Sequence, residues 1–293
     1  MRRIKNGYLW AVAVIAISIM GVQIAQAQTI IPDSALVPST TYYTDLIGGG
    51  IGNIAVMTGG GNAANVGGTD GRNDDGYDGP LNLGFTMNFF GTDYSQFYAN
   101  NNGNISFNNG ISAYTPTGPI GANEPIISPF FADVDTRNSA SGVMHIRTDI
   151  PNEVIVTWDA VGYYDTNANK LDSFQLVLRG PGYTIPVGEG PIGFFYKSMQ
   201  WETGDASGGT NGFGGTPAAV GFGNGAGQGE ELQGSIQNGI SGIVNDHHIW
   251  FNQNLTVVPP PPSNNVPEPG SLSMLAGMGL SGAGILFRRR RLA

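Results

Sequence analysis

The sequence predicts an all-β fold: a β-sandwich-like domain of many short antiparallel strands with glycine- and asparagine-rich loops, flanked by an apolar helix at each end. Apolar residues make up 40% of the chain and aromatic residues 10%, which is enough to fill a core and excludes wholesale disorder. The 46 glycines follow no three-residue repeat, which excludes collagen and favours turns. Between the two ends, no stretch carries the apolar stripe of an amphipathic helix.

The N-terminus has the features of a secretory signal peptide, which we assign to residues 1–27. Basic residues stand before an apolar stretch at residues 9–20, the predicted signal helix: Arg2, Arg3 and Lys5. The small-x-small pattern that signal peptidase accepts follows at residues 25–27, so we expect cleavage between Ala27 and Gln28. The alternative is an uncleaved membrane anchor.

The mature chain begins with a glycine- and asparagine-rich part, residues 28–78. Two runs of three glycines, at 48–50 and 59–61, predict that this part is mostly loop. One or two short strands are expected within it, for example at residues 51–58.

Strand patterns dominate residues 79–255, which we interpret as one β domain. Leu83, Phe85, Met87 and Phe89 alternate with small or polar residues, as in a half-buried strand. Residues 149–152 predict a hairpin turn. Further strands are expected at residues 143–148, 153–158, 174–178, 192–196, 218–222 and 248–251. Many short strands with glycine-rich turns favour two packed sheets.

The C-terminus combines a proline-rich linker, residues 256–265, with a three-part tail, residues 266–293. Pro267-Glu268-Pro269 comes first, an apolar segment follows at residues 272–287, and the arginine cluster 288–291 comes last. At about 1.5 Å per residue the apolar segment is about 24 Å long, somewhat short for a bilayer core of about 30 Å. We predict a transmembrane helix here, with the arginines on the cytoplasmic side.

The tail closely resembles the PEP-CTERM sorting signal of Gram-negative bacteria. The matching residues are Pro267, Glu268, Pro269, Arg288, Arg289, Arg290 and Arg291. The resemblance implies that an exosortase in the inner membrane recognises the tail and processes it near Pro-Glu-Pro. It also implies secretion through the inner membrane, transient anchoring there, and delivery to the cell surface or to an exopolysaccharide matrix. An unprocessed tail anchor is the alternative.

A second resemblance runs along the β domain, from about Gly79 to Phe251. Phe89-Phe90-Gly91 opens it and Asp133-Val134-Asp135-Thr136-Arg137 lies near its centre. Several blocks in order are similar to the nidogen-like (NIDO) domain: residues 89–91, 94, 100–107, 127–137, 156–158, 173–178, 195–196, 200–204 and 220–222.

The nidogen-like resemblance implies an extracellular protein of cell–matrix adhesion without a catalytic site. We therefore expect a non-enzymatic surface protein whose partners are extracellular polysaccharide or other matrix components, as in a biofilm. Animal relatives carry disulfide-rich modules beside this domain, whereas this chain has no cysteine. The alternatives are a passive structural component of the matrix and a polysaccharide-modifying enzyme.

Charge argues against nucleic acid as a partner. The chain has 13 Lys and Arg against 22 Asp and Glu, a formal net charge of -9, and seven of the basic residues lie at the two ends. The region between the ends is therefore more acidic still and repels phosphates. Such a surface suits divalent cations, or simply solubility outside the cell.

Two acidic clusters are candidate calcium sites, and no other cofactor is expected. Asp133 and Asp135 would share one face of an extended strand, where two carboxylates can chelate Ca²⁺ with nearby carbonyls. The alternative is that they order the following turn and pair with Arg137. The second cluster consists of Asp70, Asp74, Asp75 and Asp78. It does not have the spacing of an EF-hand loop, so the alternative is a solvated acidic turn.

Signs of catalysis or sugar binding are weaker. His247 and His248 would point to opposite faces of a strand, so they cannot easily bind one metal. The mature region has no G-x-S-x-G nucleophile elbow. Glycosidase pairs would be arbitrary choices among many acids: Asp159 with Asp165, or Glu202 with Asp205. Four aromatic residues could line a sugar platform, although most large aromatics in a β domain are core: Trp158, Tyr163, Tyr164 and Trp201.

Overall fold

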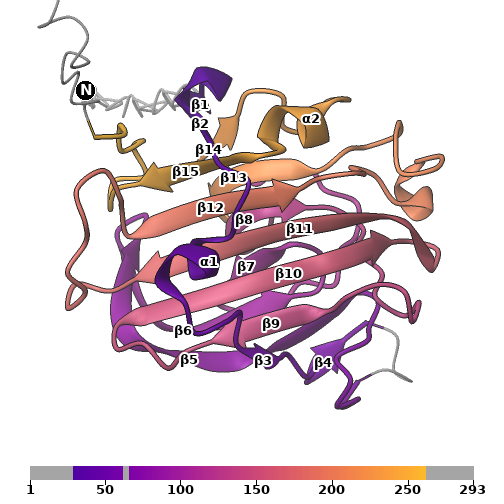
Figure 1. Cartoon of the computed structure of the whole chain (residues 1–293), viewed down its shortest axis with the longest axis horizontal. Helices are drawn as coiled ribbons and strands as arrows, with labels where there is room; N and C mark the ends of the chain where they lie inside the picture. Colours follow the sequence, from indigo (N-terminus) through magenta and orange to yellow (C-terminus); the bar gives the residue numbers. More distant parts are fainter. Residues whose placement is uncertain (1–28, 62–65, 262–293) are drawn as a thin grey trace, which may run out of the picture.

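A computed structural model describes residues 29–61 and 66–261, which form two β-sheets packed face to face (Figure 1). The first sheet has eight strands in the order β1-β14-β13-β8-β7-β6-β5-β4. The second has seven, in the order β2-β15-β12-β11-β10-β9-β3. The predicted all-β, sandwich-like fold is confirmed.

The eight-stranded sheet is antiparallel except where β1 pairs in parallel with β14. Its strands are β1 (Thr29–Ile31), β4 (Gly59–Gly60), β5 (Gly76–Phe89), β6 (Thr92–Asn100), β7 (Asn104–Ser106), β8 (Pro125–Phe131), β13 (Ala219–Asn224) and β14 (Gly229–Leu232).

The seven-stranded sheet is antiparallel throughout. Its strands are β2 (Val37–Pro38), β3 (Asn53–Ile54), β9 (Met144–Arg147), β10 (Glu153–Tyr163), β11 (Asn167–Arg179), β12 (Ile192–Ser198) and β15 (His247–Phe251). The two α-helices of the described residues are short: α1 (Tyr43–Ile47) and α2 (Ile240–Val244). The described residues also contain two 3-10 turns, η1 (Asp33–Ala35) and η3 (Asp205–Ser207).

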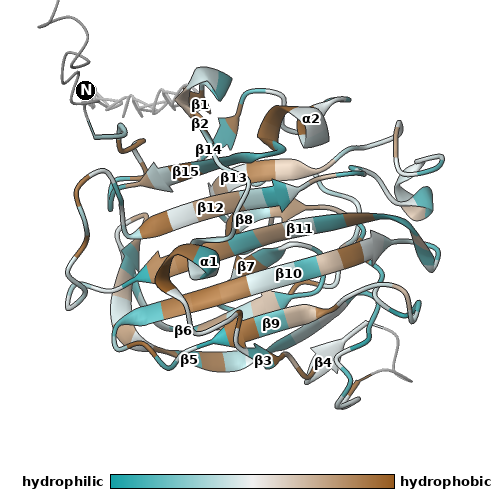
Figure 2. Cartoon of the chain, in the orientation of Figure 1, coloured by the Kyte–Doolittle hydropathy of each residue, from teal (hydrophilic) through white to brown (hydrophobic). Residues whose placement is uncertain are grey.

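Alternating apolar residues place one face of each sheet in a shared core (Figure 2). Along β5 the side chains of Leu83, Met87 and Phe89 are buried, as the period-two pattern predicts, whereas Phe85 is only partly buried and packs at the margin of the same core. Phe222 of β13 contacts Phe194 of β12 across the two sheets, with ring centroids 5.4 Å apart. Each such side chain contributes about 1.5 to 3 kcal/mol through burial.

The predicted hairpin around residues 149–152 is present. It joins β9 to β10, and Trp158 stands opposite Met144 in the register. Asn152 has φ 61°, a left-handed conformation that asparagine adopts more readily than most residues. The expected strands at 174–178, 192–196, 218–222 and 248–251 correspond to β11, β12, β13 and β15.

Residues 29–61 and 66–78 are built into the sandwich. They supply β1 and β4 to the first sheet, β2 and β3 to the second, and the start of β5. Helix α1 covers the outer face of the second sheet, where Tyr43 packs against Phe195 and Trp250 (Figure 1). The strand expected at residues 51–58 is limited to the two residues of β3.

Several sequence predictions lie outside the described residues. They are the signal peptide with its cleavage site at Ala27 and Gln28, the apolar segment at 272–287, and the sorting residues from Pro267 to Arg291. Within residues 29–61 and 66–261, no helix is long and apolar enough to cross a membrane.

Candidate metal site

The acidic residues meet where the chain passes from one sheet to the other. After β8, in the first sheet, Val134 forms a bridge with Tyr163 of β10, in the second. One residue later, Asp135 forms a bridge with Asp74, which lies just before β5. The crossing segment after β8 therefore lies against the segment that leads into β5.

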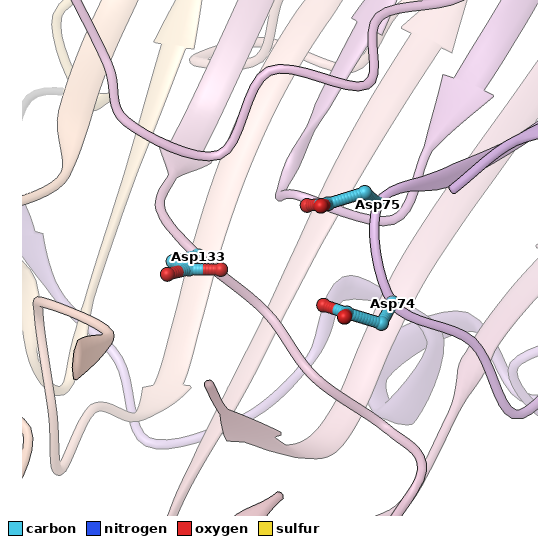
Figure 3. Close-up of side chains that lie close together, drawn as sticks. All are labelled: Asp74, Asp75 and Asp133. Atoms are coloured by element: carbon cyan, nitrogen blue, oxygen red, sulfur yellow. The ribbon is translucent and has the colours of Figure 1, made fainter. Parts of the chain in front are cut away.

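This arrangement brings three carboxylates together, from Asp74, Asp75 and Asp133. One oxygen of each lies within 4.8 Å of an oxygen of the other two. Figure 3 shows the three side chains pointing toward a common space, Asp133 from one side and the Asp74–Asp75 pair from the other. We call these three residues the aspartate cluster.

The members of the aspartate cluster have few partners. Asp133 is 1% exposed, and neither of its carboxylate oxygens has a hydrogen-bond partner among the described residues. Asp74 is 7% exposed; its Oδ2 lies 3.1 Å from Arg137 Nη2, and its Oδ1 is buried without a partner. Asp75 accepts one hydrogen bond, from Asn102 Nδ2 at 2.7 Å.

Burial and mutual repulsion make ionisation of these carboxyls costly. Burial, with the neighbouring carboxylates, raises the pKa of Asp133 to about 8. The same causes raise the pKa of Asp74 to about 7, although Arg137 acts in the opposite direction. Burial is also the main reason why the pKa of Asp75 is raised. The chain alone therefore does not supply the positive charge that three ionised carboxylates would need.

Asp135 lies beside the aspartate cluster but has its own partners. Its Oδ1 accepts hydrogen bonds from the backbone N and the Nε of Arg137, both at 2.9 Å. Its Oδ2 accepts from Arg137 Nη2 and from the backbone N of Thr166. Of the pair singled out in the sequence, Asp133 thus faces Asp74 and Asp75, whereas Asp135 faces Arg137.

The second acidic run also divides. Asp74 and Asp75 join the cluster, but Asp70 is exposed and accepts a hydrogen bond from the backbone N of Arg72. Asp78 lies within β5 opposite Ala99. The sequence therefore pointed to Asp133 in one acidic run and to Asp74 and Asp75 in the other, but it did not indicate that the two runs lie together in the fold.

The remaining candidates have structural surroundings. Trp158, Tyr163 and Trp201 are buried in the core, so they cannot form a sugar platform, while Tyr164 is half-buried. His248 stacks on Phe195, and Nδ1 of His247 lies 2.7 Å from the backbone oxygen of Asn245.

The carboxyls considered as glycosidase pairs hold neighbouring elements in place. Glu202 is 2% exposed and accepts hydrogen bonds from the backbone N of Gly239 and Ser241 at the start of α2. Asp159 accepts a hydrogen bond from the Tyr42 hydroxyl at 2.8 Å.

Comparison with known families agrees with this architecture. The family model of the nidogen-like domain matches residues 95–254, more than half of the chain and most of both sheets. This chain belongs to the nidogen-like domain family. The match includes Asp133 of the aspartate cluster and begins after Asp74 and Asp75.

A second family model, of the PEP-CTERM protein-sorting motif, matches residues 265–291. The resemblance recognised in the tail is therefore confirmed. Together the two matches describe a secreted extracellular protein that is sorted by an exosortase.

Related proteins include alpha-tectorin of Mus musculus and Gallus gallus, each 32% identical to this chain over 52% of its length. Nidogen of Drosophila melanogaster is 27% identical over 33% of the chain. The aligned part spans only 8% of either alpha-tectorin and 9% of the nidogen. No solved structure matches the chain.

Proposed function

We propose that this chain is a non-enzymatic adhesion protein that binds extracellular polysaccharide or another matrix component outside the cell that secretes it. The observation that carries the proposal is the presence, on one chain, of a nidogen-like domain and a PEP-CTERM sorting motif. The motif directs the chain to the envelope, and the domain supplies a rigid β scaffold on which loops can present a binding surface.

The proposal includes processing of the chain at both of its ends. Signal peptidase would cut between Ala27 and Gln28 as the chain crosses the inner membrane of a Gram-negative bacterium. The apolar segment at 272–287 and the arginines at 288–291 would then hold the chain in that membrane. An exosortase would process the tail near Pro267-Glu268-Pro269 and pass the protein to the surface or the matrix.

A groove of mixed polar and apolar lining, at one end of the sandwich and with residues from both sheets, is our candidate for the ligand-binding surface. Two adjoining hollows, of about 530 and 260 Å³, share lining residues that include Pro181, Pro191 and Gln253. Tyr183 and Asn254 line the larger hollow, and Asn88 lines the smaller. Amide groups beside an aromatic ring are suited to the hydroxyls and the apolar face of a sugar.

The test is co-sedimentation of the mature chain with the extracellular matrix of the organism that produces it. We expect saturable binding that Gln253→Ala weakens, because this exposed amide lies where the two hollows meet. The matched control is Gln237→Ala, an exposed glutamine outside the groove, which should bind like the unaltered chain.

Each rival function predicts a different result. A passive matrix component would sediment without saturation, and a polysaccharide-modifying enzyme would release shortened or altered glycan. Binding that is equal in the two glutamine variants would remove the groove from the proposal while leaving adhesion in place.

A further inference from the structure

The aspartate cluster combines three carboxylates with too few partners inside the protein. The side chain of Asp133 is almost fully buried, accepts no hydrogen bond among the described residues, and points toward Asp74 and Asp75 (Figure 3). Oδ1 of Asp74 is also buried without a partner. A buried carboxylate without hydrogen bonds is costly, so this arrangement indicates a missing positive partner.

We propose that Asp74, Asp75 and Asp133 together bind one divalent cation, and that the cation is Ca²⁺. The site joins members of two acidic runs that lie far apart in the sequence, so neither run forms it alone.

The spacing of the oxygens fits one ion. Ca²⁺ binds oxygen at about 2.3 to 2.6 Å, so two oxygens on opposite sides of the ion lie about 4.6 to 5.2 Å apart. An oxygen from each of the three aspartates lies within 4.8 Å of the other two, so all three oxygens can contact the same ion. The rest of the coordination shell would be backbone carbonyls and water.

The local charge also favours a cation. Among residues 29–61 and 66–261, Arg137 is the basic residue that forms ion pairs in this region, with Asp74, Asp135 and Asp165. No ion pair in the described residues reaches Asp75 or Asp133. A bound divalent cation would supply the charge that these two carboxylates lack.

The donor set selects the kind of metal. All three side-chain ligands are carboxylates, which suit hard cations such as Ca²⁺ and Mg²⁺ rather than Zn²⁺ or copper. Ca²⁺ tolerates irregular geometry and several protein ligands, whereas Mg²⁺ requires a near-ideal octahedron and keeps most of its waters. Three carboxylates from two separate segments therefore favour Ca²⁺.

Binding would have a structural consequence. Asp74 and Asp75 lead into β5, and Asp133 lies on the segment that leaves β8 for the second sheet. One ion would therefore join the entry to the longest strand of the first sheet to the crossing between the sheets.

The test uses residues 28–293 in a mild detergent, after treatment with a chelator. We expect isothermal titration with Ca²⁺ to give one site per chain, and saturating Ca²⁺ to raise the Tm by several degrees relative to chelator. Asp133→Asn and Asp75→Asn should each weaken binding at least tenfold and remove the rise in Tm. Mg²⁺ should raise the Tm less than Ca²⁺.

The matched control is Asp172→Asn. Asp172 is another fully buried aspartate with one oxygen lacking a partner, but it lies outside the aspartate cluster. This variant should bind Ca²⁺ like the unaltered chain. The proposal is overturned if the unaltered chain binds no Ca²⁺, if Asp133→Asn and Asp75→Asn bind as tightly as Asp172→Asn, or if Mg²⁺ binds in preference to Ca²⁺. All of these measurements use the isolated chain, so they are independent of whether it binds matrix.

Discussion

Two groups of buried charges in this molecule are handled in opposite ways. In the first, Arg179 is fully buried, with Nε 2.9 Å from Glu153 and Nη2 2.6 Å from Glu189. Its guanidinium also donates to Tyr43 and lies over the rings of Tyr43, Tyr183 and Trp250. In the second, the aspartate cluster, three carboxylates lie together and only Asp74 forms an ion pair, with Arg137 at the margin.

The difference shows which buried charges the protein itself compensates. The Arg179 group has its cation, its anions and an aromatic enclosure within one chain, so each of its ions has a partner of opposite charge. In the aspartate cluster, only Asp74 has a partner of opposite charge, Arg137. The charge of Arg179 is therefore compensated within the chain, and that of the aspartate cluster, by our proposal, by a bound cation.

Removing the cation of the Arg179 group should lower the stability of the fold more than the other substitutions below. Arg179→Met leaves Glu153 buried and unpaired, so we expect the free energy of unfolding to fall by about 3 to 5 kcal/mol in urea denaturation. The control is Lys197→Met, which breaks a half-exposed pair with Asp45 and should cost at most about 1 kcal/mol. Similar losses in the two variants would contradict the view that burial makes the Arg179 group essential.

Adding a methyl group beside the aspartate cluster should lower the stability of the fold by an intermediate amount. A Cβ on Gly204 would lie 2.5 Å from Oδ2 of Asp133, although the backbone φ of -79° suits alanine. Gly204→Ala should therefore lower the free energy of unfolding by about 1 to 3 kcal/mol through steric overlap alone. Gly242→Ala in α2 is the control, since its Cβ would meet nothing within 4 Å. Equal stability of the two variants would show that the side chain of Asp133 can move to make room for the added methyl group.

The smallest effect concerns Asp172, an uncompensated carboxylate outside the cluster. Its Oδ1 accepts hydrogen bonds from the backbone N of Gln200 and Trp201, and its Oδ2 has no partner among the described residues. Burial raises its pKa well above the ordinary value of 3.8. The unfolded chain therefore loses this proton at lower pH than the folded chain, and the stability that Asp172 contributes falls as the pH rises above 3.8.

Asp172→Asn should reverse this loss. The amide keeps an acceptor for the two backbone groups and carries no charge, so the variant should gain about 1 kcal/mol over the unaltered chain at pH 8 and less at pH 5. Urea denaturation at both pH values, in chelator, measures the difference. A gain that does not change with pH would mean that the Asp172 carboxyl does not titrate differently in the two states.

The fold was predictable wherever its signal is local. The alternation from Leu83 to Phe89 and the turn at Asn152 both follow from nearest neighbours in the chain, and both are present. Strand β14 has the sequence GEEL, and its two adjacent glutamates do not give the alternating pattern of a strand. It is a strand because it pairs with β13 and β1, which lie elsewhere in the sequence. Helices α1 and α2 have five residues each, too short to show an apolar period.

The candidate site was predictable only in halves. Acidic residues in short runs are visible in any sequence, and both runs were recognised as possible calcium ligands. What joins Asp133 to Asp74 and Asp75 is the bridge between Asp74 and Asp135, a contact between segments far apart in the chain. The i, i+2 spacing of Asp133 and Asp135 suggested a shared face, but Arg137 lies two residues further on and engages Asp135.

The pairing of β1 with β14 and of β2 with β15 has a consequence for the order of folding. Each of these N-terminal strands forms the edge of its sheet, and its partner strand, β14 or β15, lies near the C-terminal end of the domain. A chain exported from its N-terminus cannot pair β1 until β14, which ends at Leu232, has crossed the membrane, and cannot pair β2 until His247 and His248 have crossed. Closing such long loops is slow. We therefore expect β1 and β2 to dock last, when most of the sandwich has already formed.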